Sequence, residues 1–89
     1  MVKLVEVIKG TTSYDLREVF INPKHVVYLR EDTTTKRHLT EGKFPDDLDV
    51  RQTFTKVYVD NGTTGTEFVV VGGPTLIESK LKGKTLING

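Results

Sequence analysis

The sequence predicts a mainly β fold: a small antiparallel sheet of about five strands, curled or closed into a barrel, with one short C-terminal helix. The first observation is residues 54–71, where two runs rich in β-branched and aromatic residues flank a turn. Asn61-Gly62 supplies the positive φ angles that a tight hairpin turn needs. The second observation is that the other apolar runs are also short and are separated by turn residues, which is typical of antiparallel sheets.

Length and composition limit the alternatives. The 89 residues predict a single domain spanning 1–89. No cysteine is present, so disulfides and thiolate metal sites are excluded. The net charge of +1 gives no global electrostatic argument for nucleic-acid binding. Charged residues interrupt the apolar N-terminal run, which argues against a signal peptide or a membrane span, so we expect a cytoplasmic protein with no membrane partner.

The first two strands are expected on either side of a turn at residues 10–13. Residues 2–9 form the first strand, and the second runs from about Tyr14 or Leu16 to Ile21. Leu16 and Phe20 fall on one face of that second strand. Asn22-Pro23 ends it, because proline donates no backbone hydrogen bond.

A third strand is expected at residues 26–29, and the 54–71 hairpin then supplies the fourth and fifth. Between them, residues 32–52 are predicted to form a long polar loop, a feature that is usually functional or disordered in a small domain. Its candidate anchors to the core are apolar: Leu39, Phe44, Leu48 and Val50. An alternative is a strand extension at residues 37–39, which would make a long hairpin arm.

The short helix is predicted at residues 75–81, after Gly72-Gly73-Pro74. Thr75 and Glu78 have the spacing of a capping box. Gly83 is expected to end the helix. Residues 85–89 are expected to be either a frayed tail or one more short strand.

Two segments resemble the small flagellar-operon proteins of the FlbD (SwrD) type. Residues 19–29 are similar to their strand, Asn-Pro, strand opening, and residues 55–62 with 68–72 and the 77–81 helix are similar to their closing half. The same pattern occurs in small bacteriophage proteins. The resemblance implies a small bacterial or phage β-domain and supplies no catalytic residue.

No catalytic or metal site is predicted, and no cofactor is expected. The only serines, Ser13 and Ser79, lack the sequence context of a nucleophile. His38 with the acidic run at residues 46–49 is better explained as a solvated turn than as a metal site. We therefore expect the protein not to be an enzyme.

Two sets of candidate binding residues remain. For a nucleic acid or a protein partner, basic residues near the long loop and two aromatic side chains are candidates: Lys36, Arg37, His38, Lys43, Arg51, Tyr28 and Tyr58. For an anion, the candidates are Gly72, Gly73 and Thr75 at the predicted helix start.

Several predicted strands are apolar on both faces. In residues 2–9, for example, Leu4 and Ile8 oppose Val5 and Val7. One short helix cannot cover both faces of a five-stranded sheet, and monomers avoid large exposed apolar patches. We therefore expect a non-catalytic bacterial or phage accessory protein that forms a homo-oligomer and binds a macromolecular partner. A β-barrel that binds single-stranded nucleic acid is the alternative.

Overall fold

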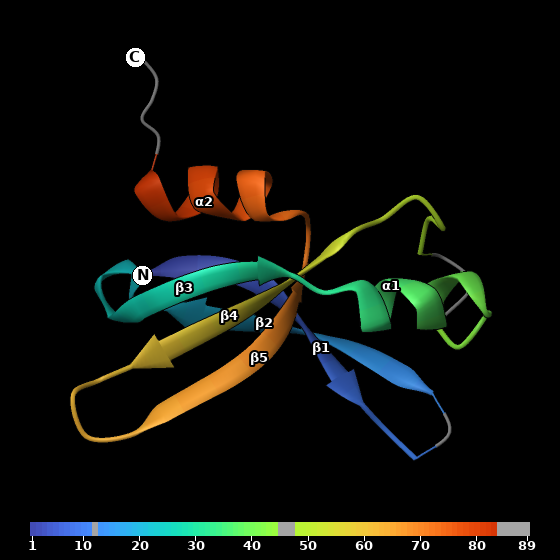
Figure 1. The fold of residues 1–89 in the computed structure, drawn as a ribbon, viewed down its shortest axis with the longest axis horizontal. Coiled ribbons are helices and arrows are strands. Elements are labelled where there is room, and N and C mark those ends of the chain that lie inside the picture. The colour runs from blue at the N-terminus through green and yellow to red at the C-terminus, as the bar shows by residue number, and fades with distance from the viewer. Residues whose placement is uncertain (12, 45–47, 84–89) are drawn as a thin grey trace.

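The computed structural model describes residues 1–11, 13–44 and 48–83, and within them it contains five strands, two α-helices and one 3-10 turn. The strands are β1 (Val2–Lys9), β2 (Tyr14–Ile21), β3 (Val26–Glu31), β4 (Phe54–Asp60) and β5 (Gly65–Val71). The α-helices are α1 (Thr33–Thr40) and α2 (Pro74–Lys82), and the 3-10 turn is Pro23–His25. The predicted antiparallel β fold with a C-terminal helix is confirmed (Figure 1).

The five strands form one sheet in the order β2-β1-β5-β4-β3. All neighbours are antiparallel, and the sheet is not closed, because β2 and β3 remain at its two edges. β1 and β2 pair along eight positions, whereas β1 and β5 are joined only at Glu6–Val70 and Val7–Val69. The β1–β2 and β4–β5 hairpins therefore diverge from a short central junction, as Figure 1 shows.

Helix α2 covers one face of the sheet. Its Ile77 is fully buried in a cluster with Leu4, Ile21, Val57 and Val70. Burial of side chains of this size is worth about 1.5–3 kcal/mol each, so this cluster is a substantial part of the core.

The ends of α2 differ in part from the prediction. The helix begins at Pro74 with Gly73 as N-cap and has no side-chain cap hydrogen bond, so the predicted capping box of Thr75 and Glu78 is wrong. Proline at the first helical position has no backbone N–H, so it leaves one donor fewer that a capping side chain would have to satisfy. Gly83 ends the helix with φ of 89°, as predicted. The predicted tail at residues 85–89 lies outside the described residues.

Helix α1 corrects the prediction of a loop or a strand extension over residues 32–52. Asp32 caps the helix by accepting hydrogen bonds from the backbone N–H groups of Thr34 (3.1 Å) and Thr35 (3.3 Å) and from the Thr35 hydroxyl. At the other end, Gly42 has φ of 80°, and the N–H groups of Gly42 and Lys43 donate to carbonyls of the last turn. This is a Schellman motif, and the two caps explain why a threonine-rich segment is helical.

Helix α1 closes a second core on the opposite face of the sheet. The buried members of this cluster are Val7, Tyr14, Leu39, Phe44 and Phe54. Of the predicted loop anchors, Leu39 and Phe44 are buried and Leu48 packs against the cluster, whereas Val50 is exposed. The second core covers only the end of the sheet next to α1, so no helix of the described residues lies over the rest of this face.

Candidate functional surfaces

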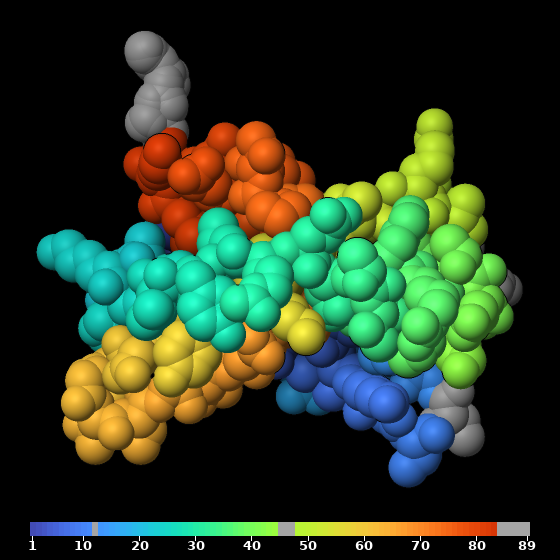
Figure 2. Space-filling model, in the orientation of Figure 1, coloured from blue at the N-terminus to red at the C-terminus, as the bar shows by residue number. Residues whose placement is uncertain are grey.

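The uncovered part of the face carries an apolar patch on β1 and β2. Val5 and Leu16 are each 36% exposed, and Phe20 is 60% exposed. The strand register puts all three on the same face as Val7, because Val7 is opposite Leu16 and residues two apart share a face. We call Val5, Leu16 and Phe20 the β1–β2 patch. Figure 2 shows the turn end of the β1–β2 hairpin protruding at the lower right, and Phe20 lies toward the opposite end of that hairpin.

One ion pair borders the patch. Lys3 Nζ lies 3.4 Å from Glu18 Oε2, and both side chains are more than half exposed. Lys3 is opposite Phe20, and Glu18 is opposite Val5. The patch therefore has one positive group, Lys3, at its edge and one negative group, Glu18, between Leu16 and Phe20 on the same face.

The two candidate tyrosines occupy the same face of the sheet farther along, on β3 and β4. Tyr28 and Tyr58 stack with their ring centroids 5.3 Å apart, and the Arg30 guanidinium lies 5.0 Å from the Tyr28 ring centre. The Tyr28 hydroxyl donates to Glu67 Oε2 at 2.7 Å. This hydrogen bond, followed by partial burial, raises the pKa of Tyr28 above its usual 10.0. Each tyrosine ring therefore has one face covered by the other tyrosine, and that face cannot stack on a nucleic-acid base.

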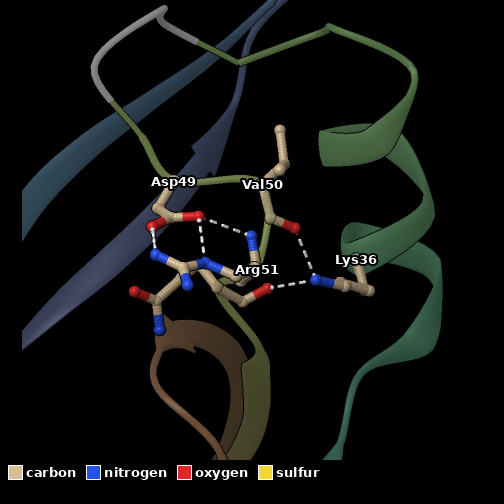
Figure 3. A network of polar contacts seen from close by, with 5 residues as sticks. Lys36, Asp49, Val50 and Arg51 are labelled. Carbon is tan, nitrogen blue, oxygen red and sulfur yellow. Dashed lines mark hydrogen bonds and ion pairs between the residues drawn. The ribbon is translucent and has the colours of Figure 1, made fainter.

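Two of the predicted basic contacts are engaged within the chain (Figure 3). Lys36 Nζ donates to the carbonyl oxygens of Val50 (2.6 Å) and Gln52 (2.9 Å). Arg51 donates from Nη2 to Asp49 Oδ2 at 2.8 Å and from Nε to Oδ1 at 3.2 Å. These side-chain hydrogen bonds, with one from the Arg51 backbone, lower the pKa of Asp49. Lys36 therefore links α1 to residues 50 and 52, and Arg51 forms a local pair with Asp49.

The other predicted basic residues, Arg37, His38 and Lys43, do not form one surface. Arg37 is exposed on α1. His38 and Lys43 line a cavity of about 250 Å³ beside the β1–β2 turn, together with residues that the sequence analysis did not select: Lys9, Gly10, Thr11, Ser13 and Tyr14. The Tyr14 hydroxyl lies 2.5 Å from His38 Nδ1. Alternation on β2 puts Tyr14 on the same face as Leu16, but nothing in the sequence pattern indicated that α1 would bring His38 to it.

The predicted anion residues at the start of α2 have other partners. The Gly72 N–H donates to the Thr53 carbonyl at 2.8 Å, and the Gly72 carbonyl accepts from the Thr55 hydroxyl at 2.7 Å. Gly73 accepts from the Ile77 N–H through its carbonyl. Thr75 is exposed and lines a groove of about 560 Å³ between β3 and α2. The arrangement leaves no Gly72 N–H for an anion.

The described part of the chain contains no group of three or more His, Cys, Asp or Glu side chains arranged to hold a metal ion. None of its helices combines the length and the apolar character needed to cross a bilayer. A scan against protein-family models, a search of curated proteins and a search of solved structures each find no match. The resemblance to small flagellar-operon proteins therefore stays a prediction.

Proposed function

We propose that this chain is a non-catalytic assembly protein that associates with copies of itself through the β1–β2 patch and, once assembled, binds a macromolecular partner. We place it in the cytoplasm of a bacterial or phage-infected cell. The observation that carries the proposal is the exposure of Val5, Leu16 and Phe20 on one uncovered sheet face. Exposed apolar side chains gathered on one face are a recurrent mark of protein interfaces.

The charges around the patch favour a second copy as the occupant. A two-fold axis through the patch would bring Lys3 of one copy toward Glu18 of the other, twice per dimer, because both residues border the same apolar area. The small net charge of +1 gives little repulsion between copies. An isologous dimer therefore satisfies both the apolar and the charged groups of this surface.

The nucleic-acid alternative has weaker support. Lys36 donates to backbone carbonyls, and Arg51 pairs with Asp49. Tyr28 and Tyr58 stack on each other. A titration with mixed single-stranded oligonucleotides at several salt concentrations separates the two proposals. Binding that weakens steeply with salt would favour nucleic acid, because phosphate contacts release counterions.

The test of self-association is sedimentation equilibrium over a wide range of protein concentrations. We expect a reversible dimer or larger oligomer, and we expect Phe20→Ser to raise its dissociation constant by about tenfold or more, since burial of a phenyl side chain is lost. Leu16→Ser should act in the same direction. Leu76→Ser is the matched control, because Leu76 is a leucine 50% exposed on α2, away from the patch.

A charge exchange tests the predicted geometry. Lys3→Glu or Glu18→Lys alone should weaken association by placing like charges together, and the double exchange should restore it. A strict monomer at tens of micromolar, or equal weakening by Leu16→Ser and Leu76→Ser, would contradict the proposal.

A further inference from the structure

The cavity beside the β1–β2 turn is lined by cations and hydroxyl groups. Lys9 from the end of β1 and Lys43 from the segment after α1 contribute ammonium groups, and Ser13 and Thr11 contribute hydroxyls. No carboxylate is among its lining residues in the described part of the chain. Segments distant in the sequence thus converge on one small positive cavity.

The lysines are available to a ligand. Lys9 has no ion-pair partner among residues 1–11, 13–44 and 48–83. Lys43 Nζ approaches Glu41 Oε1 at 3.7 Å, and both side chains are about half exposed, so this pair is weak. An anion of higher charge density can displace it.

Tyr14 fixes the orientation of His38. The Tyr14 ring is buried and stacks on Phe44, with centroids 4.4 Å apart and planes 5° apart. Burial, and then the negative charge of Asp32, raise the pKa of Tyr14. The hydrogen bond between the Tyr14 hydroxyl and His38 Nδ1 occupies Nδ1, so Nε2 is the imidazole nitrogen that remains for a ligand.

The position next to the C-terminal end of α1 is compatible with an anion. Helix C-termini repel negative charge through their free carbonyl groups. Here the carbonyls of Arg37, His38 and Leu39 accept hydrogen bonds from the N–H groups of Glu41, Lys43 and Gly42, respectively. The Schellman motif thus reduces the negative potential at this end of the helix.

We propose that this cavity binds a phosphate group, either free or as a phosphate monoester, with Lys9 and Lys43 balancing its charge and Ser13 and His38 donating hydrogen bonds. The volume of about 250 Å³ accommodates a phosphate and a small part of the group that carries it. This inference is independent of self-association, because none of its residues belongs to the β1–β2 patch.

The test is an NMR titration with inorganic phosphate at constant ionic strength, with chloride as the balancing anion. We expect saturable shifts at the amides of residues 9–11, 13, 14, 38 and 43 and at the His38 ring. O-phosphoserine and adenosine monophosphate, titrated in parallel, identify the source of the group: tighter binding of one of them than of phosphate shows which carrier the cavity accepts. Equal binding of all three indicates free phosphate as the ligand.

Lys9→Gln should weaken phosphate binding by about tenfold, as expected when one charge-assisted contact is lost. Tyr14→Phe keeps the stack on Phe44 but frees His38 Nδ1, and it should weaken binding less than Lys9→Gln. Lys80→Gln on α2 is the control for net charge and should leave binding unchanged. The proposal would be overturned by shifts that do not saturate or that chloride reproduces. It would also be overturned if Lys9→Gln and Lys80→Gln weakened phosphate binding equally. These outcomes do not depend on whether the chain self-associates.

Discussion

The Tyr28 hydroxyl on β3 and the Glu67 carboxylate on β5 are joined by a hydrogen bond of 2.7 Å that passes over the intervening strand β4. Tyr58 on β4 stacks under this bridge against the Tyr28 ring. The outer face of β3, β4 and β5 is thus partly covered by its own side chains. On the β1–β2 half of the same face, α1 covers Val7 and Tyr14, and the apolar patch occurs beyond them, where no helix of the described residues lies.

The bridge predicts a loss of stability at high pH. The folded-state pKa values of Tyr28 and Tyr14 lie above their usual 10.0, so the unfolded chain releases these protons first. Their contribution is fully present below the unfolded pKa and is lost as the pH rises through the folded values. Urea unfolding at a series of alkaline pH values should show a decrease in the free energy of unfolding, and Tyr28→Phe should make that decrease shallower. An unchanged slope in Tyr28→Phe would show that the bridge does not form in solution.

The Tyr28–Tyr58 stack depends on a glycine. A β-carbon at Gly65 would lie 1.9 Å from the Tyr58 hydroxyl oxygen, so Gly65→Ala must displace the Tyr58 ring. We expect a loss of stability of about 1 kcal/mol, typical of mild overpacking, and a changed near-UV circular dichroism signal. Thr66→Ala, at the next and exposed position, is the control and should leave the spectrum unchanged. An identical spectrum for Gly65→Ala would contradict the stacked arrangement.

The Asp32 cap predicts a sharp difference between two substitutions. Asp32→Ala removes the acceptor of two backbone N–H groups and of the Thr35 hydroxyl, and it should destabilise the protein by about 1–2 kcal/mol. Asp32→Asn keeps one acceptor oxygen and should cost less. Thr33→Ala, at an exposed first-turn position, serves as the control. Chemical denaturation measures all three, and equal values for Asp32→Ala and Thr33→Ala would exclude the cap.

The sequence predicted the sheet well because strand signals are local. Alternation placed β1, β2 and β3 to within two residues at each end, and the outer ends of β4 and β5 as the structure has them. The tight turn predicted at Asn61-Gly62 is wrong: four residues, 61–64, join β4 to β5, and among these only Gly62 has a positive φ. Helix α1 was missed because threonine has a low helix propensity and the segment has few apolar residues. Its two caps, Asp32 and Gly42, were visible in the sequence and are the signals that would have found it.

Of the candidate functional surfaces, the apolar one was predicted in part and the cavity beside the β1–β2 turn was not predicted. The two-sided apolar pattern of residues 2–9 predicted apolar side chains left open on one face, and Val5 is 36% exposed there, whereas Val7 on the same face is buried in the cluster that the unpredicted helix α1 closes. The contact between Tyr14 and His38 was not predictable, since 24 positions separate them and their approach depends on where α1 begins. Long-range contacts of this kind follow from packing rather than from local pattern.

Lys36 distinguishes a structural role from nucleic-acid binding. Lys36→Met keeps most of the aliphatic side chain but removes the donors to the Val50 and Gln52 carbonyls, which should destabilise the protein by about 1 kcal/mol and increase amide exchange in the segment after α1. Arg37→Met, at the adjacent exposed position, is the control for loss of one positive charge and should leave stability nearly unchanged. If Lys36 instead contacted a nucleic acid, Lys36→Met would lower oligonucleotide affinity while the free energy of unfolding stayed constant. Denaturation and oligonucleotide titration on the same two variants therefore decide between these roles.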